Sequence, residues 1–326
     1  MMKLYLAPME ELTGYIFRNT LYKHFGHVDK FFTPFISPDN RIMKTRSAEE
    51  LLPANNEGLY VVPQLLTNDA EQFNDAAKLI AGMGYEEINI NFGCPSNTVA
   101  AKCKGSGILR APELMDRFLD GIFNGENRVQ SAYPNIKISV KTRVGYNDES
   151  EFTAVLDVLA RYPFSEITVH PRLKKDLYKG NPRMEMFDMA CEKLNADIVY
   201  NGDVYTADDH NRLSERFRSA LYGDRVTAIM IGRGAVANPG IFRQIRTGQA
   251  MTKDELYDFL SDLYDAYKEA LGAGNAISKL KEVWSYTVSL IPDEKKRTTA
   301  FKSIVKAKTE SQFRDATLVA RSSLVI

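Results

Sequence analysis

The chain has 326 residues, of which 44% are hydrophobic, with 42 basic and 42 acidic residues and a mean hydropathy of −0.30. This length suits an α/β barrel with a small addition. The zero net charge argues against a protein that coats nucleic acid through bulk charge, although it allows a local basic face. No apolar run is long enough to cross a bilayer, and the first residues lack the pattern of a signal peptide, so we expect a soluble, cytoplasmic protein.

Cysteine and histidine are sparse and scattered along the chain. Cys94, Cys103 and Cys191 form neither a disulfide framework nor a CxxC pair, and the four histidines stand far apart without an HExxH motif. We therefore expect no metal site.

Short β-rich segments alternate with amphipathic ones over the first three quarters of the chain. Most of the β-rich segments are nearly continuous in apolar and β-branched residues, which is typical of parallel strands buried on both faces. Eight such segments in roughly 240 residues predict a closed (β/α)₈ TIM barrel rather than an open sheet. The predicted strands are Leu4–Pro8, Lys30–Ile36, Leu59–Leu66, Glu87–Asn91, Ile136–Val144, Glu166–Arg172, Asp197–Asp203 and Thr227–Arg233, with helices at Asp69–Met83, Pro112–Phe123 and Glu151–Tyr162.

Past Pro239 only helical patterns remain. Thr252–Leu271 has apolar residues at helical spacing, with Thr252 as its N-cap and Gly272 as its C-terminal cap. Residues 272–275 are expected to interrupt the helix. Further helices are predicted at Ala276–Leu290, Asp293–Ile304 and Glu310–Arg321. We therefore predict a catalytic barrel over residues 1–245 and a small all-helical domain over residues 246–326.

Polar and reactive residues stand where the predicted strands end. Active sites of barrels lie at the carboxyl ends of the strands, so these residues are the candidates for chemistry. In strand order they are Pro8 and Met9, Gln64, Asn91 to Pro95, Lys141 and Arg143, His170 to Arg172, Asn201 to Asp203, and Gly232 to Ala235.

The last two strand ends suggest an anion site. Gly232 and Gly234 would let backbone N–H groups approach a phosphate, and the guanidinium of Arg233 would donate charged hydrogen bonds to it. A tight turn without a ligand explains Gly-Arg-Gly equally well, but its place after the last strand favours phosphate.

Lys141 and Cys94 each have two interpretations. A lysine inside a barrel is costly without a partner, so Lys141 either forms a structural ion pair or stabilises the anionic reduced ring of a bound flavin. A lone cysteine is usually a small core residue. The Gly-Cys-Pro setting of Cys94 in a predicted active-site loop favours a chemical role, with Cys103 as the second candidate.

Together these residues resemble the tRNA-dihydrouridine synthase family over nearly the whole chain. The most diagnostic segment is Asn91-Phe92-Gly93-Cys94-Pro95-Ser96. The other matching segments, in the family's order, are Ala7-Pro8-Met9 with Thr13 and Phe17-Arg18, Gly105, Gly107 and Leu109–Leu114, Ser139–Gly145, Val169-His170 with Arg172 and Tyr178, Asn201–Asp203, and Met230–Ala235.

The resemblance implies an FMN-bearing barrel and a helical domain that binds tRNA, with NADPH or NADH as a transient reductant. No protein partner is inferred, and the oligomeric state stays open. Cys94 would be the general acid that protonates C5 of uracil after hydride reaches C6, so we expect the pKa of its thiol not to be strongly lowered. The implied uracil contacts are Asn91, Arg143 and Arg172, and the implied flavin contacts are Pro8, Met9, Gln64, Lys141, His170, Asn201, Asp203, Gly232 and Arg233.

Several departures from the family pattern leave the substrate RNA and the modified position open. They are Glu10 for a small residue, Pro34 for glutamate, Asn89 for aspartate, Pro171 for glycine, Leu173 for threonine, and a more basic, less glycine-rich loop at Lys102-Cys103-Lys104. None of them removes Cys94 or an implied flavin contact.

The segment from Lys279 to Lys308 holds eight basic and three acidic residues. Such a face could track the phosphates of RNA, and the candidate contacts are Lys279, Lys281, Lys302 and Lys306. A solvated helical face with Trp284 in the core is the alternative.

Three other functions stay open at this point. An FMN-barrel reductase of a small molecule would have no need of a basic helical tail. A flavin-bearing RNA-binding factor without reductase activity would not need Cys94, Lys141 and His170. The same chemistry could also act on ribosomal RNA.

Overall fold

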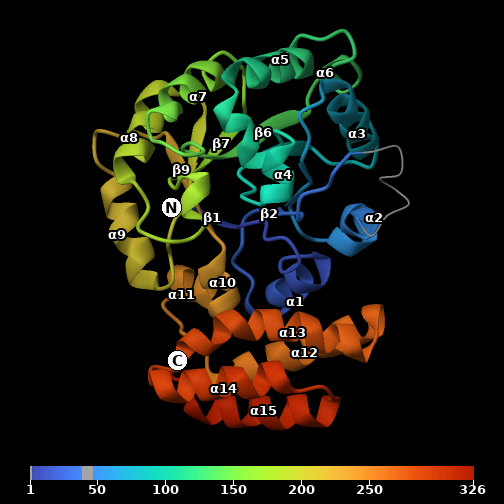
Figure 1. Cartoon of the computed structure of the whole chain (residues 1–326), viewed down its shortest axis with the longest axis vertical. Coiled ribbons are helices and arrows are strands. Elements are labelled where there is room, and N and C mark those ends of the chain that lie inside the picture. The colour runs from blue at the N-terminus through green and yellow to red at the C-terminus, as the bar shows by residue number, and fades with distance from the viewer. Residues whose placement is uncertain (1, 39–46) are drawn as a thin grey trace. The chain divides into compact units, whose positions relative to one another are not determined.

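The computed structural model describes residues 2–38 and 47–326. They form two compact units (Figure 1). The barrel unit comprises residues 2–8, 30–38, 47–202 and 212–230, and the helical unit comprises residues 9–29, 203–211 and 231–326. The predicted boundary between residues 245 and 246 lies inside helix α11 (Ile241–Thr247). The division into a catalytic and an RNA-binding domain stays a prediction, because compactness does not reveal what each part binds.

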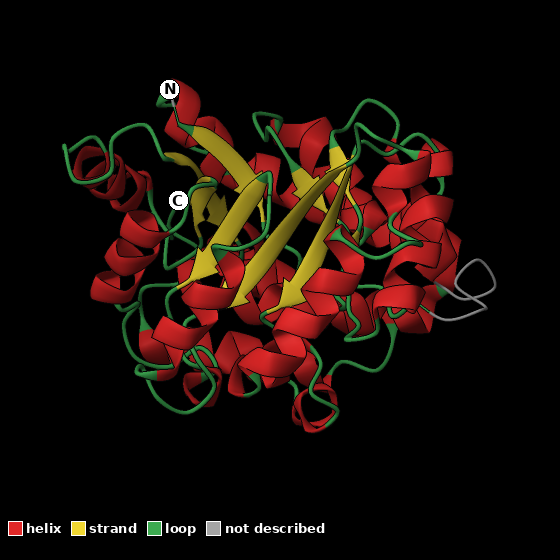
Figure 2. Ribbon diagram, turned by 90° about the horizontal axis from the view of Figure 1, so that it is seen from above, coloured by secondary structure: helices red, strands yellow, loops and turns green. Residues whose placement is uncertain are grey.

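The strands form a parallel (β/α)₈ barrel, as predicted. Seven strands pair in the order β1-β9-β8-β7-β6-β5-β4, and β2 pairs with β3. Parallel bridges from Tyr5 to Lys30 and from Ile36 to Leu65 join the two sheets. Figure 2 shows the strands running in one direction with helices outside them. The strands are β1 Lys3–Leu6, β2 Phe31–Phe32, β3 Val61–Val62, β4 Gln64–Leu65, β5 Glu87–Phe92, β6 Lys137–Arg143, β7 Glu166–His170, β8 Asp197–Tyr200 and β9 Val226–Ile231.

The predicted strand Leu59–Leu66 is interrupted at Pro63, which separates β3 from β4. The pyrrolidine nitrogen has no hydrogen to donate to a neighbouring strand. Its carbonyl still accepts from the Asn89 N–H at 2.9 Å, so the chain keeps its path into β4.

The helices of the barrel unit follow the predicted amphipathic segments. Asp69 caps α3 by accepting from the Gln72 N–H at 3.0 Å, and Pro112 occupies the first turn of α5, where no N–H is needed. These helices are α2 Ser47–Leu51, α3 Ala70–Gly82, α4 Asn97–Ala101, α5 Pro112–Phe123, α6 Val129–Ala132, α7 Glu151–Leu159 and α8 Met184–Lys193, with 3₁₀ turns η2 Pro53–Asn56, η3 Gly105–Arg110 and η4 Lys174–Asp176. Helix α9 (Ala207–Phe217) belongs partly to each unit.

The interior of the barrel is apolar on one side and polar on the other. A cluster of buried residues from β1, β2, β3, β8, β9 and their ends forms the apolar side: Tyr5, Ala7, Phe32, Val62, Val199, Ala228 and Met230. On β5 to β7 the polar residues recur at every second position, which places them on one face of each strand. They are Glu87, Asn89 and Asn91, then Ser139, Lys141 and Arg143, then Glu166, Thr168 and His170.

The helical unit contains α1 together with the helices that follow the barrel. Phe259 of α12 lies 5.8 Å from Phe17 and 5.7 Å from Phe25 of α1, measured between ring centroids. Among the described residues no helix is long and apolar enough to cross a membrane. The helices are α1 Tyr15–Phe25, α10 Arg233–Ala237, α11 Ile241–Thr247, α12 Lys253–Leu271, α13 Ala273–Thr287, α14 Glu294–Lys306 and α15 Glu310–Ser323, with η5 at Val288–Leu290.

The caps predicted for α12 are confirmed, but the break after it is shorter than predicted. Thr252 forms a capping box with Glu255, and Gly272 ends the helix with a φ of 81°. The next helix begins at Ala273 rather than Ala276. Gly272 alone is enough to separate the two helices. Gly274 is tolerated in the first turn of the second helix, where the backbone N–H groups have no partner within the helix.

Candidate active site

The candidate residues of the barrel unit lie on neighbouring strands at their carboxyl ends. Asn91 on β5 is in register with Lys141 on β6, and Arg143 on β6 is in register with His170 on β7. Asn201 directly follows β8 and donates from Nδ2 to the Met230 carbonyl of β9 at 2.8 Å. The structure thus brings these predicted residues to one end of the sheet.

The loop that carries Cys94 is held from both sides. Asn91 Oδ1 accepts from the backbone N–H groups of Gly93 at 2.9 Å and Cys94 at 2.8 Å. The Cys94 carbonyl accepts from the Ser106 N–H at 3.1 Å and from Ser106 Oγ at 2.7 Å. Cys94 itself is buried, with 9% of its surface exposed. A fixed position of this kind is what a proton donor requires.

Gly105 lets the two halves of this loop approach each other. Its φ is +55°, a conformation that favours glycine, and a Cβ placed on it would lie 2.9 Å from Cys94 Cβ and 3.0 Å from the Cys94 carbonyl oxygen. The glycine at this position therefore has a structural reason, which is close packing against Cys94.

The other two cysteines are placed differently. Cys103 lies just beyond α4 with a φ of +52°, half-buried, and its sulfur accepts from Arg110 at 3.6 Å. Cys191 is buried in α8, where burial raises the pKa of its thiol to about 12. Cys94 is the cysteine among the three that lies at the end of a barrel strand.

Lys141 has no hydrogen-bond acceptor and no ion pair in the described part of the chain, and its pKa is lowered. Burial, followed by the positive charge of Arg143, lowers its pKa to about 7. An anionic or carbonyl-bearing ligand would relieve this penalty, whereas the structural ion pair considered from the sequence does not form.

Arg143 donates hydrogen bonds to three backbone carbonyls. The residue is 1% exposed, and its guanidinium donates to the carbonyls of Gly93 at 2.9 Å, Leu173 at 3.0 Å and Leu177 at 2.9 Å. Burial lowers its pKa to about 10, so it stays charged at neutral pH. It thereby ties the Cys94 loop to the loop after β7. Its predicted contact with uracil stays a prediction.

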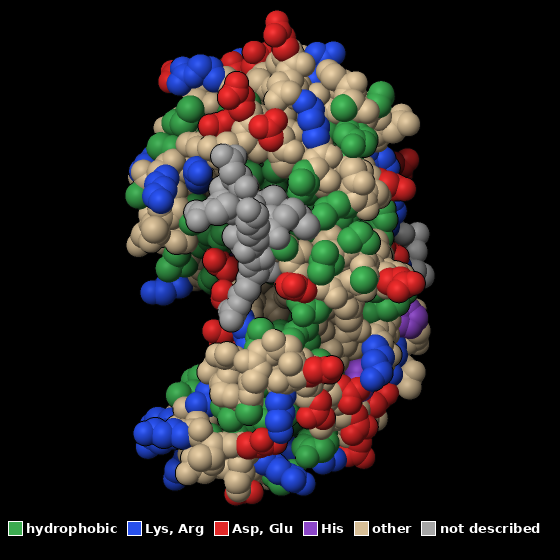
Figure 3. Space-filling view, turned by 90° about the vertical axis from the view of Figure 1, so that its right-hand side faces the viewer, with side chains coloured by type: hydrophobic (Ala, Val, Ile, Leu, Met, Phe, Trp, Pro, Cys, Tyr) green, Lys and Arg blue, Asp and Glu red, His purple; other side chains and the backbone are tan. Residues whose placement is uncertain are grey.

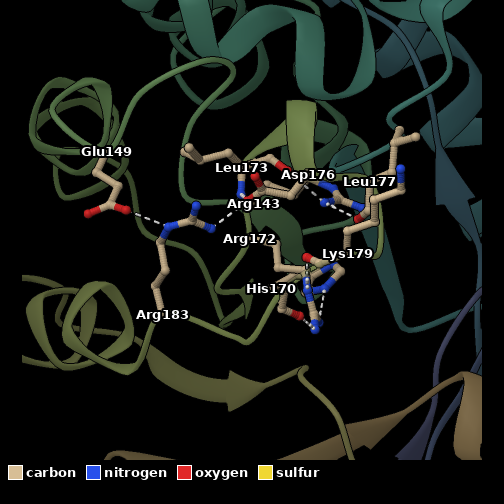
Figure 4. A network of polar contacts seen from close by, with 10 residues as sticks. Arg143, Glu149, His170, Arg172, Leu173, Asp176, Leu177, Lys179 and Arg183 are labelled. Carbon is tan, nitrogen blue, oxygen red and sulfur yellow. Dashed lines mark hydrogen bonds and ion pairs between the residues drawn. The ribbon is translucent and has the colours of Figure 1, made fainter.

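Arg172 holds the far part of the loop after β7 (Figure 4). It is fully buried and donates to the carbonyls of Lys179 at 3.3 Å and Gly180 at 2.6 Å. It also lies 3.4 Å from His170 Nε2. Because a guanidinium has no acceptor, Nε2 must accept and the imidazole proton lies on Nδ1. The predicted contact of Arg172 with the substrate stays a prediction.

The same loop is closed by carboxylates. Asp176 accepts from the Leu173 N–H at 2.9 Å and pairs with Arg183, which also pairs with Glu149 (Figure 4). The exposed Leu177 and Tyr178 lie at the tip of this loop. The ring of Tyr178 faces that of His170, with centroids 6.4 Å apart. The backbone that carries these two exposed side chains is therefore tied down by hydrogen bonds and ion pairs on both sides.

Four further predicted cofactor residues belong to the helical unit, namely Met9, Asp203, Gly232 and Arg233, whereas Pro8 and Gln64 belong to the barrel unit. Arg233, the first residue of α10, forms an ion pair with Asp203 and lies over the ring of Tyr205. Gly232 caps this short helix directly after β9. Met9 N–H donates to Thr13 Oγ1 at 2.7 Å, in the turn that follows Pro8. These contacts are compatible with phosphate binding, a role that stays a prediction.

Gly234 has a second reason to be glycine. A Cβ on it would lie 1.9 Å from the Val204 carbonyl oxygen, so any side chain would clash with that backbone. The Gly-Arg-Gly sequence thus reflects packing at Gly234 whatever the ligand.

The four lysines predicted to contact RNA differ in their surroundings. Lys279 is paired with Glu11, and Lys281 donates to the Ala307 carbonyl. Lys302 and Lys306 are exposed on α14, four residues apart and hence on one face.

Charge in the helical unit is divided between its helices. Figure 3 shows acidic side chains gathered on one side of this unit. Helix α12 carries the acidic residues Asp254, Glu255, Asp258, Asp262, Asp265 and Glu269, and helix α14 carries the basic residues Lys295, Lys296, Arg297, Lys302 and Lys306. A chain of zero net charge therefore still offers a local basic face.

Sequence reasoning assigned no role to the polar side chains deeper in the barrel. Asn89, Ser139 and Glu87 are buried and hydrogen-bonded in a series that reaches Gln64 and Asn91. The alternation of polar and apolar residues in β5 and β6 was the signal that could have found them. Among the described residues no group of three or more His, Cys, Asp or Glu side chains could hold a metal ion.

Comparison with known proteins identifies the family. Residues 5–321 match the sequence profile of the family described as Dihydrouridine synthase (Dus). The chain is 30% identical over 294 residues to a tRNA-dihydrouridine(16) synthase of Aquipseudomonas alcaligenes, covering 86% of this chain and 89% of the relative. It is 26% identical over 242 residues to tRNA-dihydrouridine synthase B of Pasteurella multocida, covering 74% and 68%.

Solved structures share the fold at low identity. Morphinone reductase superposes with a TM-score of 0.54 at 12% identity, covering 79% of this chain and 88% of that chain. The old yellow enzyme from Trypanosoma cruzi gives a TM-score of 0.53 at 9% identity, covering 82% and 94%.

Substitution of Gly105 by alanine should expose the thiol of Cys94. The added Cβ must displace the Cys94 loop, so alkylation of Cys94 by iodoacetamide should become several-fold faster, as followed by peptide mass spectrometry. Gly58→Ala is the matched control, because Gly58 also has a positive φ, of +76°, but nothing within 4 Å of its added Cβ. Equal alkylation rates in both variants would contradict the proposed packing role.

Substitution of Lys141 by methionine should stabilise the protein most at low pH. Between about pH 7 and 10.5 the Lys141 side chain is protonated in the unfolded chain but not in the folded protein. The burial of its charge therefore destabilises the folded state fully below about pH 7, and this destabilisation decreases as the pH rises. The gain in free energy of unfolding over the wild type should therefore decline by at most about 1.4 kcal/mol per pH unit across that window. Urea denaturation at several pH values measures it.

Lys137→Met supplies the control for this experiment. Lys137 is exposed at the start of the same strand, so its replacement should change stability little and by the same amount at every pH. A Lys141→Met gain that did not depend on pH would refute the assignment of the buried charge.

Proposed function

The chain belongs to the dihydrouridine synthase family, and on that premise we propose that it is an FMN-dependent tRNA-dihydrouridine synthase. It would reduce the C5–C6 bond of specific uridines in tRNA. The observation that carries the proposal is that a fixed Cys94 follows β5 while Lys141 stands on the neighbouring strand β6 with no hydrogen-bond partner among the described residues.

The residues fit a flavin by the chemistry of their free groups. Lys141 offers an ammonium, and Asn91 offers its remaining N–H, since its oxygen already accepts two bonds. An isoalloxazine ring presents carbonyl oxygens and ring nitrogens that accept such donors. We assign flavin contacts, following the family pattern, to Pro8, Met9, Gln64, Lys141, His170, Asn201, Asp203, Gly232 and Arg233.

The reaction adds a hydride and a proton to uracil. When bound, reduced FMN supplies the hydride for C6, and NADPH or NADH serves as the electron source. Cys94 gives the proton from its thiol to C5, and the resulting thiolate is reprotonated from water. Asn91, Arg143 and Arg172 orient the base, which must leave its stack to reach the barrel.

The residues after 245 are proposed to bind the RNA, with Lys302 and Lys306 as phosphate contacts. The basic face of α14 supports this, as do the names of the relatives. A tRNA substrate implies a cytoplasmic protein.

Replacement of Cys94 by alanine should abolish the modification while leaving the flavin bound. General acid catalysis contributes roughly 10²- to 10⁴-fold, so dihydrouridine formation in tRNA should fall by about that factor. Nucleoside mass spectrometry of tRNA from a deletion strain complemented with each variant measures this, and the visible spectrum of the purified protein reports the flavin. Cys191→Ala is the control, because Cys191 is a buried helical residue.

The outcomes separate the alternatives. A yellow protein whose deletion removes dihydrouridine from one tRNA position supports the proposal and identifies the site. A yellow protein with unchanged tRNA would point to ribosomal RNA or a small molecule. A colourless protein that FMN cannot reconstitute would refute the proposal.

Replacement of Lys302 by alanine should weaken tRNA binding and reduce its salt dependence. Loss of one phosphate contact lowers the slope of log K against log salt concentration by about 0.7 to 0.9. Filter binding at several salt concentrations measures the slope. Lys268→Ala is the control, since the Lys268 ammonium is already paired with Glu310 at 3.0 Å. An unchanged slope would remove Lys302 from the contact surface.

A further inference from the structure

A series of hydrogen bonds crosses the interior of the barrel unit, beginning at the Cys94 loop. The N–H groups of Gly93 and Cys94 donate to Asn91 Oδ1. Asn91 Nδ2 in turn donates to Gln64 Oε1 at 2.7 Å. Both side chains are buried, so these bonds are shielded from competing water.

The series continues to a buried carboxylate at the other end of the strands. Gln64 Nε2 donates to Asn89 Oδ1 at 2.8 Å, and Asn89 Nδ2 donates to Ser139 Oγ at 2.9 Å. The Ser139 hydroxyl donates to Glu87 Oε1 at 2.6 Å. Four consecutive side-chain links thus join Asn91 to Glu87.

The strand register builds this path. Gln64 is paired with Asn89 across β4 and β5, and Asn89 is paired with Ser139 across β5 and β6. These three side chains therefore lie at one level, with Asn91 two residues further along β5 and Glu87 two residues back. No loop has to close to form the series.

Every bond in the series runs in the same direction, and both ends enforce it. Backbone N–H groups can only donate, and an ionised carboxylate can only accept. The ammonium of Lys30 lies 2.9 Å from Glu87 Oε2 and forms an ion pair with that carboxylate. Each amide between the ends must accept from one side and donate to the other. The orientation of Gln64, Asn89 and Asn91 is thus fixed by chemistry.

This direction decides what the two amides can offer to a ligand. Asn91 has used both lone pairs of its oxygen, so it can offer only its second N–H. Gln64 retains one lone pair on Oε1 and one N–H on Nε2. An Asn91 turned the other way would present an oxygen to a carbonyl of the base and repel it.

We propose that Asn89, Ser139 and Glu87 are positioning residues of the active site, which fix the atoms that Gln64 and Asn91 present to the flavin and the uracil. This inference rests on the proposed function. The three residues act only through Gln64 and Asn91, because they are themselves buried in the barrel.

At the Glu87 end of the series, one ammonium lies between two carboxylates. Lys30 also lies 3.1 Å from Glu166 Oε2, which accepts from Tyr5 at 2.8 Å. Burial raises the pKa of Glu166. Tyr60 donates to Glu87 Oε2 at 3.4 Å, and burial and the charge of Glu87 raise the pKa of that phenol. Tyr5 belongs to this cluster but not to the series that reaches the site.

Two variants of buried hydroxyls test the proposal. Ser139→Ala cuts the series, and Tyr5→Phe removes one hydrogen bond from the same charged cluster without cutting it. FMN affinity of the full chain, measured by quenching of flavin fluorescence, should fall roughly three- to tenfold for Ser139→Ala, the loss expected for about one hydrogen bond. Tyr5→Phe should keep the wild-type affinity. Equal losses in both variants would overturn the proposal, since they would indicate a general structural effect.

A charge variant provides a second measurement with a pH signature. The Asn89→Asp side chain has nearly the same shape, and when protonated it can still accept from Gln64 and donate to Ser139. When ionised it can only accept, and the single proton of the Ser139 hydroxyl cannot serve both the new carboxylate and that of Glu87. Burial and the neighbouring charge of Glu87 raise the pKa of the new carboxyl from about 3.9 by up to about 3 units, so it is still largely protonated at about pH 5.

The ratio of the FMN dissociation constants of this variant and the wild type should therefore rise with pH. It should be near one at about pH 5 and roughly three- to tenfold at about pH 9. Asn74→Asp is the matched control, because Asn74 is equally buried but bonds to the Gly121 carbonyl and the Val129 N–H outside the series. Its ratio should not change with pH. A constant ratio for Asn89→Asp would overturn the proposal.

The wild type distinguishes failure of the inference from failure of the function. A wild-type protein that binds FMN and forms dihydrouridine, with no effect of Ser139→Ala, would leave the function standing and refute the positioning role. A wild-type protein that does not bind FMN would refute the proposed function, and the positioning role would fall with it.

Discussion

The need to satisfy every polar group inside the barrel governs the rest of this structure. A buried amide or hydroxyl without a partner costs about 1–3 kcal/mol, and a buried charge costs more. One side of the barrel interior is lined by such groups, and the Glu87 carboxylate, held by Lys30, gives their bonds a common end point. The demand is met along the series from Gln64 to Glu87, whereas Glu166 Oε1 and Thr168 Oγ1 on β7 have no partner among the described residues. Near the carboxyl ends of β5 and β6, Lys141 and one N–H of Asn91 also keep donors to offer. Donors that a ligand can use therefore remain at the carboxyl ends of these strands.

Two buried arginines extend the same principle to the loops. Backbone carbonyls of an irregular segment need donors, and a guanidinium supplies several from one side chain. Arg143 donates to the carbonyls of Gly93, Leu173 and Leu177, and Arg172 donates to those of Lys179 and Gly180. One arginine thus couples the Cys94 loop to the loop that carries Tyr178. A loop built in this way can be long and still hold a side chain in a defined place, which a catalytic site requires.

The parts of the fold that were predictable from the sequence depend on local signals. Continuous apolar segments indicated the strands, and Thr252 and Gly272 marked the ends of α12 because caps act through their own backbone. The Cys94 loop was recognised from its residues, but the roles of the candidate residues are not tested by their positions. The series from Asn91 to Glu87 was missed because its bonds join strands that are far apart in sequence. The split at Pro63 and the early start of α13 depend on single residues, at the limit of what pattern reasoning resolves.

The lowered pKa of Lys141 links ligand binding, protonation and stability in one group. At a pKa of about 7 the side chain is divided between its charged and neutral forms at neutral pH. A ligand that places negative charge near the ammonium must favour the charged form, and by linkage the charged form must favour that ligand. The penalty that burial imposes on the free protein is then offset in the complex, so binding also stabilises the fold. In a reaction that builds negative charge on its base, the same cation and the N–H of Asn91 interact more strongly as the charge develops. A residue that weakens the empty protein is therefore suited to stabilise the bound and reacting one.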